Sequence, residues 1–347
     1  MKVVVGMSGG VDSSVSALLL KEQGYEVIGL YMKNWEDLDG SCPGTADYED
    51  VVRVCDTLQI PCYTINFVQE YQDSVFSHFI EELKMGYTPN PDVLCNREIK
   101  FKALFQKAKE LGADFLATGH YAQTHEGELL RSADLDKDQT YFLYALKKEI
   151  LNQVLFPIGH LKKKEVRALA EARGLATAAK KDSTGICFIG KRNFREFLGG
   201  YIAYKEGAFE TLGGKKVGTH QGASFYTIGQ RKGLKIGGPG EAWFVVGKNV
   251  ERNVVLVEQG QDHPALYRPS LEATDVSWID KAPQFPLRCT AKIRYRQQDQ
   301  VCTVTQNEND RLSVEFDSPQ RAITPRQAIV FYQGPRCLGG ALIAPSF

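Results

Sequence analysis

The amino-acid sequence predicts an α/β protein: an N-terminal parallel sheet with helices on both faces, a small, mainly β central domain and a C-terminal β-barrel. The length of 347 residues exceeds one typical domain. Strand-like and helix-like segments alternate over residues 2–118, which favours a parallel sheet covered by helices. Beyond about Gly200 helical periodicity fades, and short β-rich runs separated by Gly and Pro replace it. We therefore expect domains at 1–200, 201–262 and 263–347.

Each predicted element follows from apolar spacing and from the residues that interrupt it. A first strand is expected at 2–6, followed by a helix over 11–23 that Gly24 ends. On the same grounds we expect strands at 26–32, 62–67 and 114–118, and helices at 47–58, 69–85, 100–111 and 160–174. Further strands are expected at 242–246, 254–257, 287–295, 300–306, 312–316 and 328–332, with a linker at 260–269. Ligands of open parallel sheets bind at the carboxyl ends of the strands, so functional residues are expected there.

The composition narrows the class of protein. Lys+Arg and Asp+Glu are 42 each, which excludes a histone-like polycation, and 43% hydrophobic residues are too many for a disordered chain. No apolar run approaches the ~20 residues of a membrane helix, and Met1 leads directly into a strand-like segment. We expect a cytoplasmic protein with no membrane partner. Its eight cysteines form no Cys-x-x-Cys pair, so buried thiols are the default interpretation for each of them.

A glycine-rich loop between the first strand and the first helix predicts a phosphate site. It comprises Gly6, Met7, Ser8, Gly9, Gly10, Val11, Asp12 and Ser13. Adjacent glycines let the backbone approach a phosphate, and the free N–H groups of the following helix point at it. The Gly-Lys-Ser/Thr end of a Walker A loop is missing. The alternative is a tight turn with serine caps.

This loop resembles that of the PP-loop ATP pyrophosphatases, which split ATP into AMP and pyrophosphate while they adenylate a substrate oxygen. The resemblance implies an adenine nucleotide alpha-hydrolase fold and assigns ATP binding to the eight loop residues. It also implies that Asp12 holds Mg²⁺ or positions the pyrophosphate. Amide-forming synthetases and tRNA-modifying thiolases both remain open at this point.

Two cysteines lie in segments that suggest reactivity. Pro91 breaks the preceding helix and the next helix is expected to start near Asn96 or Arg97, so Cys95 is predicted at a helix N-terminus, where the dipole stabilises a thiolate. Asp92 lies within one turn and can relay a proton. Cys187 lies in the stretch 160–196, which holds ten Lys/Arg against four Asp/Glu, and cations lower the pKa of a thiol. The alternatives are helix caps around a core cysteine, and a solvated basic stretch.

Taken together, the loop, the stretch around Cys95 and the stretch around Cys187 resemble the bacterial-type tRNA-specific 2-thiouridylases. The resemblance covers about residues 2–333, and further matching stretches lie at 119–122, 136–143, 226–233 and 292–296. It implies a tRNA-uridine 2-sulfurtransferase that uses ATP and Mg²⁺ to adenylate the C2 oxygen of the wobble uridine, position 34. Sulfur from a Cys187 persulfide then gives 2-thiouridine, with Cys95 as the nucleophilic second thiol and Asp92 as the acid/base. Direct attack by the persulfide and release of hydrosulfide by Cys95 both remain open.

The resemblance also implies binding residues and partners. Met32 and Gly119 would contact the adenine. The implied tRNA contacts are Asn90, Pro91 and Asp92 at the target base, His120, Lys137, Asp138 and Gln139 at the anticodon loop, and Arg294, Tyr295 and Gln327 from the barrel. The implied partners are the anticodon stem-loop of Lys-, Glu- and Gln-type tRNAs and a cysteine desulfurase or sulfur-relay protein. Residues 281–347 carry nine Lys/Arg against five Asp/Glu, as expected of an RNA-facing module.

One position departs from the family. Arg326 stands where the family has glycine, so either the backbone there is strained by a positive φ or the side chain adds a phosphate contact.

Three other functions remain to be distinguished from the thiouridylase. An amide-forming PP-loop synthetase needs no second cysteine and no RNA-facing barrel. A 4-thiouridine synthetase usually carries an N-terminal RNA-binding region, whereas the loop here begins at Gly6. A non-enzymatic tRNA-binding protein would release no AMP.

Overall fold

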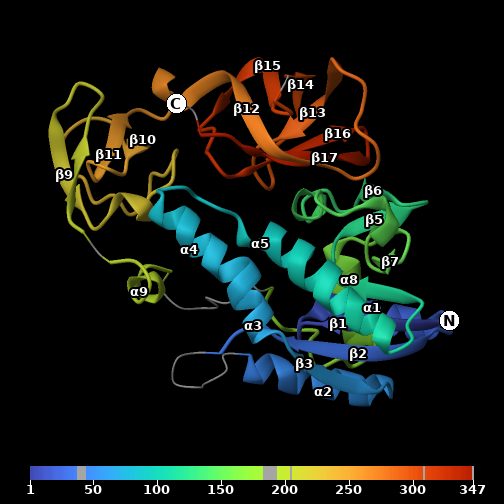
Figure 1. Cartoon of the computed structure of the whole chain (residues 1–347). Coiled ribbons are helices and arrows are strands. Elements are labelled where there is room, and N and C mark those ends of the chain that lie inside the picture. Colours follow the sequence, from blue (N-terminus) through green and yellow to red (C-terminus); the bar gives the residue numbers. More distant parts are fainter. Residues whose placement is uncertain (37–43, 183–193, 204, 308, 346–347) are drawn as a thin grey trace.

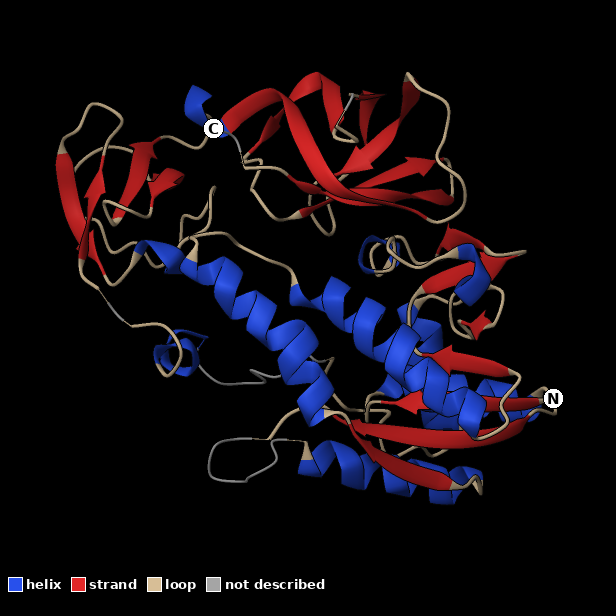
Figure 2. Ribbon diagram, in the orientation of Figure 1, coloured by secondary structure: helices blue, strands red, loops and turns tan. Residues whose placement is uncertain are grey.

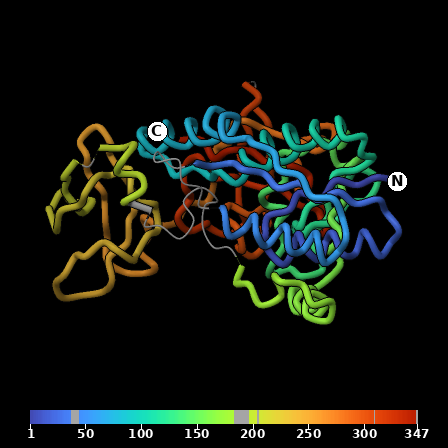
Figure 3. Tube along the Cα trace, turned by 90° about the horizontal axis from the view of Figure 1, so that it is seen from below, coloured from blue at the N-terminus to red at the C-terminus, as the bar shows by residue number. Residues whose placement is uncertain are grey.

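The computed structural model describes residues 1–36, 44–182, 194–203, 205–307 and 309–345. It confirms the predicted fold class: an α/β unit, a small β unit and a β-barrel follow one another along the chain (Figure 1). The small β unit projects to one side of the other two, as the view from below shows (Figure 3). Within the described residues, no helix has the length and apolar character needed to cross a bilayer.

The N-terminal unit is built on five parallel strands in the order β3-β2-β1-β4-β7. Their bounds are β1 Lys2–Met7, β2 Glu26–Lys33, β3 Cys62–Asn66, β4 Phe115–Thr118 and β7 Val154–Leu155. Successive side chains of a strand point to opposite faces, so Val3 and Val5 enter one apolar cluster and Val4 enters another. Both faces of the central strand are therefore buried.

Helices cover both faces of this sheet (Figure 2). The first face packs against α1 Val11–Glu22, α2 Thr45–Leu58 and α8 Lys163–Ala172. The second face packs against two long helices. One comprises α3 Val68–Tyr71, η1 Gln72–Phe76 and α4 Ser77–Lys84, and the other α5 Pro91–Leu94, η2 Cys95–Leu104 and α6 Phe105–Glu110. In both, the middle segment has π-helical hydrogen bonding.

The helix that carries Cys95 starts earlier than the sequence predicts. We expected its start near Asn96 or Arg97, but it begins at Pro91, and Asn90 is its N-cap. Proline is well tolerated at the first helical position because its missing N–H would have no partner there. Pro91 therefore starts this helix, and the expectation that it breaks the preceding helix is wrong, because α4 already ends at Lys84.

A segment between β4 and α8 connects the N-terminal unit to the barrel. It contains a hairpin that the sequence did not predict, β5 Ala122–His125 and β6 Glu128–Arg131, followed by η3 Thr140–Phe142 and α7 Lys148–Leu151. Strand β6 pairs with β17 of the barrel, so one sheet runs through both units. Arg131 strengthens this junction through Asp299, at 2.7 Å, and through its guanidinium 3.8 Å from the Tyr332 ring centroid.

The central unit follows α9 Phe194–Gly199 and is a mixed sheet in the order β10-β11-β8-β9. Its elements are β8 Gly207–Glu210, β9 Lys216–His220, η4 Ala223–Phe225, β10 Trp243–Asn249 and β11 Val254–Gln259. Strands β8 and β9 were not expected from the sequence. They were missed because short strands next to glycines show little apolar periodicity in the sequence.

The C-terminal barrel is closed by pairing between its first and last strands, β12 and β17. After η5 Pro264–Leu266 its strands are β12 Tyr267–Trp278, β13 Leu287–Lys292, β14 Gln300–Gln306, β15 Leu312–Arg321, β16 Ala328–Gln333 and β17 Arg336–Ile343. The linker expected at 260–269 is wrong in its last part, because β12 begins at Tyr267. Strand β17 was missed because it contains Gly339 and Gly340. A Cβ on Gly340 would lie 2.5 Å from the carbonyl oxygen of Ile329.

Truncation of the barrel core should be costly. Phe331 is fully buried, and its ring centroid lies 5.6 Å from that of Trp278. Phe331→Ala should lower the free energy of unfolding of the barrel by about 3–5 kcal/mol, as followed by tryptophan fluorescence in denaturant. The exposed Val301→Ala should change it by less than about 0.5 kcal/mol. Equal effects of the two changes would contradict this packing.

Candidate active site

The phosphate loop connects β1 to α1 at the carboxyl edge of the sheet, as the sequence predicted. Gly9 has φ of 72°, and a Cβ there would lie 2.4 Å from the carbonyl oxygen of Asp47, so only glycine fits. Among the described residues, none accepts a hydrogen bond from the N–H of Val11, Asp12 or Ser13. A helix N-terminus with three free donors is an anion site.

Serine hydroxyls support the loop. The Ser13 hydroxyl donates to the carbonyl of Gly10 at 3.1 Å and accepts from the N–H of Ser8 at 3.2 Å. The Ser8 hydroxyl lies 3.2 Å from that of Ser13. These bonds fix the loop and leave two hydroxyls beside the free N–H groups.

The neighbouring strands bring Met32 and Gly119 to the same edge. Met32 lies near the end of β2, opposite Ile65 of β3, and is partly buried. Gly119 directly follows β4, and a Cβ there would lie 2.6 Å from the amide nitrogen of Ser13. Glycine is therefore required for β4 and the phosphate loop to meet.

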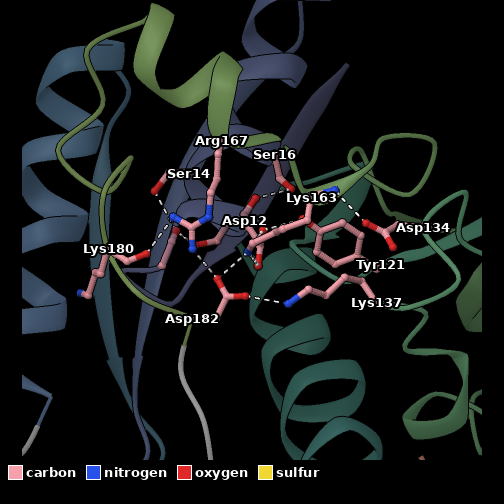
Figure 4. A network of polar contacts seen from close by, with 12 residues as sticks. Asp12, Ser14, Ser16, Tyr121, Asp134, Lys137, Lys163, Arg167, Lys180 and Asp182 are labelled. Carbon is pink, nitrogen blue, oxygen red and sulfur yellow. Dashed lines mark hydrogen bonds and ion pairs between the residues drawn. The ribbon is translucent and has the colours of Figure 1, made fainter. Parts of the chain in front are cut away.

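Asp12 takes part in an ion pair that the sequence did not reveal (Figure 4). Lys163 of α8 donates to both carboxylate oxygens of Asp12 at 2.8 Å, and the Tyr121 hydroxyl donates to Oδ1 at 2.9 Å. Of the described residues, no group of three or more His, Cys, Asp or Glu side chains is arranged to hold a metal ion. A Mg²⁺ ion at Asp12 would thus need ligands from the nucleotide and water.

Lys163 also pairs with Asp182, which lies five residues before Cys187 in the sequence. Asp182 accepts from Lys163, Lys137 and Arg167, each at 2.8 Å. Burial alone would raise the pKa of Asp182, but the hydrogen bonds from Lys137 and Lys163 outweigh it and lower the pKa to about 2. The carboxylate is therefore ionised throughout the physiological range.

A second cation secures the chain just before Asp182. Lys180 pairs with Asp47 at 2.7 Å and with Asp50 at 2.5 Å, both on α2. Arg167 also donates to the carbonyls of Ala178 and Lys180, at 2.9 and 3.0 Å. The chain leading toward Cys187 is thus held against the phosphate loop. Cys187 itself lies outside the described residues.

The surroundings of Cys95 differ from the expectation. Cys95 is the fifth residue of its helix and 2% exposed, so it does not lie at the N-terminus and the expected stabilisation of a thiolate by the helix dipole is wrong. The Asn90 side chain accepts from the N–H of Asp92 at 3.1 Å, which gives Asn90 a capping role. Burial raises the pKa of Asp92, and the charge of Lys100 partly opposes this.

His120 connects this helix to the sheet. Its Nδ1 lies 2.7 Å from the Thr118 hydroxyl at the end of β4, and its Nε2 lies 3.5 Å from the Lys100 ammonium. Burial, with the charge of Lys100, lowers the pKa of His120 well below its usual value, so the ring is neutral. At 9% exposure it fits a packed histidine better than an exposed RNA contact.

The expected tRNA-binding stretch 137–139 has structural roles in this chain. Asp138 is 5% exposed and accepts from the N–H of Ser132 and the hydroxyl of Thr140, so it does not lie on the surface. Burial raises the pKa of Asp138. The Gln139 side chain accepts from the N–H of Tyr121 at 2.9 Å.

Arg294 and Tyr295 lie in a turn after β13, not in the strand expected at 287–295. Arg294 donates to the carbonyls of Arg321 and Ala322, at 2.5 and 2.7 Å. The Tyr295 ring centroid is 4.5 Å from that of Phe142. Arg294 therefore links two parts of the barrel, and Tyr295 packs the barrel against the segment that contains Phe142.

Arg326 has φ of 66°, so of the two alternatives for this position the structure shows the positive φ. Its guanidinium pairs with Glu82 at 2.5 Å and with Asp275 at 2.9 Å, contacts that leave no need for a phosphate partner. The neighbouring Gln327 side chain donates to the carbonyl of Thr88, two residues before Asn90.

Sequence analysis missed Lys163, Arg167, Tyr121 and Lys100 as residues of this site. Lys163 and Tyr121 lie 151 and 109 positions from Asp12, whereas Arg167 is only 15 positions from Asp182 and Lys100 only 20 from His120. For Lys163 and Arg167, the available signal was the excess of cations over 160–196, which the sequence analysis assigned to Cys187. Composition shows that a segment is basic without showing which carboxylate it pairs with.

The raised pKa of Asp92 predicts a pH-dependent effect on stability. A carboxyl whose pKa is higher in the folded chain destabilises it once pH exceeds the unfolded value of about 3.9. Asp92→Asn should therefore raise the melting temperature at pH 7 by a few degrees, and the gain should vanish toward pH 4. Exposed Asp73→Asn serves as the control. A gain that persists at pH 4 would contradict the burial of an ionised Asp92.

Three family models together match most of the chain. The tRNA methyl transferase HUP domain matches residues 1–191, the tRNA methyl transferase PRC-barrel domain matches 195–259, and the aminomethyltransferase beta-barrel domain matches 268–343.

Similar proteins match over almost the whole length. The tRNA-specific 2-thiouridylase MnmA of Protochlamydia amoebophila is 61% identical over 98% of this chain and 93% of its own. That of Halalkalibacterium halodurans is 59% identical over 99% and 94%. A solved structure, the U34-tRNA thiolase NcsA from Methanococcus maripaludis, has a TM-score of 0.37 at 24% identity over 55% of this chain and 61% of its own. The chain belongs to the family of tRNA-specific 2-thiouridylases.

Proposed function

We propose that this chain is an ATP-dependent sulfurtransferase that converts the wobble uridine of tRNA, position 34, to 2-thiouridine. One observation carries the proposal: polar contacts link three features at one edge of the sheet. Lys163 pairs with Asp12 of the phosphate loop and with Asp182, which leads toward Cys187. Lys100, on the helix that carries Cys95, contacts His120 just after β4.

The first half of the reaction is adenylation. The uridine O2 attacks the α-phosphorus of ATP, and pyrophosphate leaves. The free N–H groups of Val11, Asp12 and Ser13 stabilise the negative charge that moves onto the leaving group. Lys163 and Arg167 lie within reach of the same loop through Asp12 and Asp182, and we expect phosphates to compete with those carboxylates for the two cations.

Adenine lies between Met32 and Gly119 in this proposal, beside Gly6 and Met7. Mg²⁺ at Asp12 would neutralise phosphate charge during pyrophosphate release. The donor set fits a cation that is bound mainly by phosphate and water, because Asp12 is the one carboxylate on the loop itself.

The second half of the reaction is sulfur transfer. The outer sulfur of the Cys187 persulfide becomes bonded to C2, and AMP leaves with the original oxygen. Cys95 attacks the inner sulfur, which breaks the persulfide S–S bond and leaves a Cys95–Cys187 disulfide. A thiol reductant then supplies two electrons. Earlier attack by Cys95, with release of hydrosulfide, leads to the same disulfide. Asp92 serves as the acid/base for the proton transfer of this half-reaction.

The RNA contacts are proposed from the positions that match the motifs of the family. Asn90, Pro91 and Asp92 would meet the target base, while His120, Lys137, Asp138, Gln139, Arg294, Tyr295 and Gln327 would shape the anticodon-loop site. Since several of these side chains are tied to protein groups, they would act by shaping the surface as well as by direct contact. The proposed substrates are Lys-, Glu- and Gln-type tRNAs. A cysteine desulfurase or a sulfur-relay protein would donate the sulfur, and the reaction would take place in the cytoplasm.

The two cysteines provide the most direct test of this function. With ATP, Mg²⁺, a persulfide donor and unmodified tRNA, wild-type protein should form 2-thiouridine, detected by mass analysis of nucleosides. Cys95→Ser and Cys187→Ser should each lower formation at least about 100-fold, because each removes one partner of the S–S exchange. Cys62→Ser is the control and should remain active. Full activity of either test variant would contradict the proposal, as would a methylated or 4-thiolated product.

Lys163 provides a test of the nucleotide site. Lys163→Met should weaken equilibrium ATP binding about tenfold or more, because a charge-assisted contact to phosphate is lost. The matched control is Lys164→Met, an exposed lysine of the same helix, which should bind ATP as the wild type does. Melting temperatures establish that both variants fold. Equal ATP affinities would exclude Lys163 from the phosphate site.

A further inference from the structure

A basic, glycine-rich loop in the central unit has no part in the chemistry described above. We define the basic loop as residues 229–243, between η4 and the start of β10. Arg231, Lys232 and Lys235 are all exposed on it. In the part of the chain that the structure describes, no carboxylate forms an ion pair with any of the three. Unpaired cations close together repel each other unless an anion is bound between them.

The basic loop is held in shape by the protein. The N–H of Gly229 donates to the carbonyl of Val245 at 2.8 Å, and the N–H of Val245 donates to the carbonyl of Gln230 at 3.0 Å. Leu234 is 5% exposed and anchors the middle of the loop in the core. The cations are therefore presented from a fixed backbone, which lowers the entropic cost of binding.

These residues line a hollow with a volume of about 320 Å³. Its wall includes Arg231 and Lys235, the half-buried indole of Trp243 and one carboxylate, Glu241. A Cβ on Gly238 would meet no atom within 4 Å, so this side is open. Cations beside an aromatic face suit a nucleotide unit, whose phosphate pairs with the cations and whose base can stack on the indole.

The basic loop begins where the proposed RNA-binding residues meet. The Thr227 hydroxyl lies 3.3 Å from that of Thr88, whose carbonyl accepts from Gln327. A Cβ on Gly229 would lie 2.7 Å from the Cβ of Ala322, whose carbonyl accepts from Arg294. The start of the basic loop therefore lies beside two residues that themselves contact the proposed RNA-binding residues Gln327 and Arg294.

We propose that the basic loop binds the tRNA backbone, with phosphates on Arg231 and Lys235 and one unpaired base against Trp243. The proposal rests on the function proposed above, since it takes tRNA as the substrate. It adds a contact surface in the central unit that increases the affinity for tRNA and takes no part in the chemical steps. Contacts of this kind are independent of sequence and weaken as salt rises.

The experiment compares two double variants in tRNA binding over a range of salt concentrations. R231A/K235A should weaken binding of unmodified tRNA about tenfold at physiological salt, and should reduce the slope of log K against log salt by about two. K215A/K216A removes two exposed lysines near the start of β9 and should leave both quantities unchanged. The rate of 2-thiouridine formation at saturating tRNA should match that of the wild type in both double variants.

Trp243→Leu separates stacking from charge. It should weaken tRNA binding without changing the salt slope, because stacking releases no counterions. A wild-type affinity and slope for R231A/K235A would overturn the proposal. So would unchanged tRNA binding with slower sulfur transfer from a donor protein, since the basic loop would then bind a protein. If the wild-type chain bound no tRNA at all, the proposed function itself would fail.

Discussion

The ion pairs of Lys163 are the interaction on which the proposed site depends. One ammonium, 13% exposed, joins Asp12 of the phosphate loop to Asp182, five residues before Cys187. A partly buried cation between two carboxylates must be well paired, because loss of one partner leaves an uncompensated charge. A bound triphosphate would compete for this cation and for Arg167. In the proposed function, nucleotide binding and the position of the chain leading to Cys187 would therefore be coupled through Lys163 and Arg167.

The fold brings distant residues to this point in two ways. Parallel strands place the phosphate loop, Met32 and Gly119 at one edge of the sheet. The long helix that carries Cys95 contacts His120, just after β4, through Lys100. The barrel is held against the same unit by the shared β6–β17 pairing and by Gln327, whose side chain donates to the carbonyl of Thr88. The surface that we propose for RNA therefore combines residues of the N-terminal unit and the barrel with the basic loop of the central unit.

Local signals predicted much of this arrangement. The phosphate loop, the first helix and the parallel sheet follow from neighbouring residues, so the sequence indicated them correctly. Strand β12 was missed because its stability comes from pairing with the distant strands β15 and β17, and β17 was missed because it contains Gly339 and Gly340. The strands of the β5–β6 hairpin are only four residues long, too short to show a clear alternation. Likewise, Asp12 and Lys163 are 151 positions apart, and Thr140, which donates to the buried Asp138, lies beside Tyr332 of the barrel. The start of the Cys95 helix was misplaced because Pro91 fits both a helix end and a helix start.

The central claim is that Cys95 and Cys187 react with each other over an adenylated uridine. It is tested most directly by a single turnover of persulfide-loaded protein without reductant, followed by mass analysis of its unreduced peptides. The account predicts a Cys95–Cys187 disulfide in proportion to 2-thiouridine, formed only when both ATP and tRNA are present. Formation of 2-thiouridine while the two cysteines remain unlinked would contradict it.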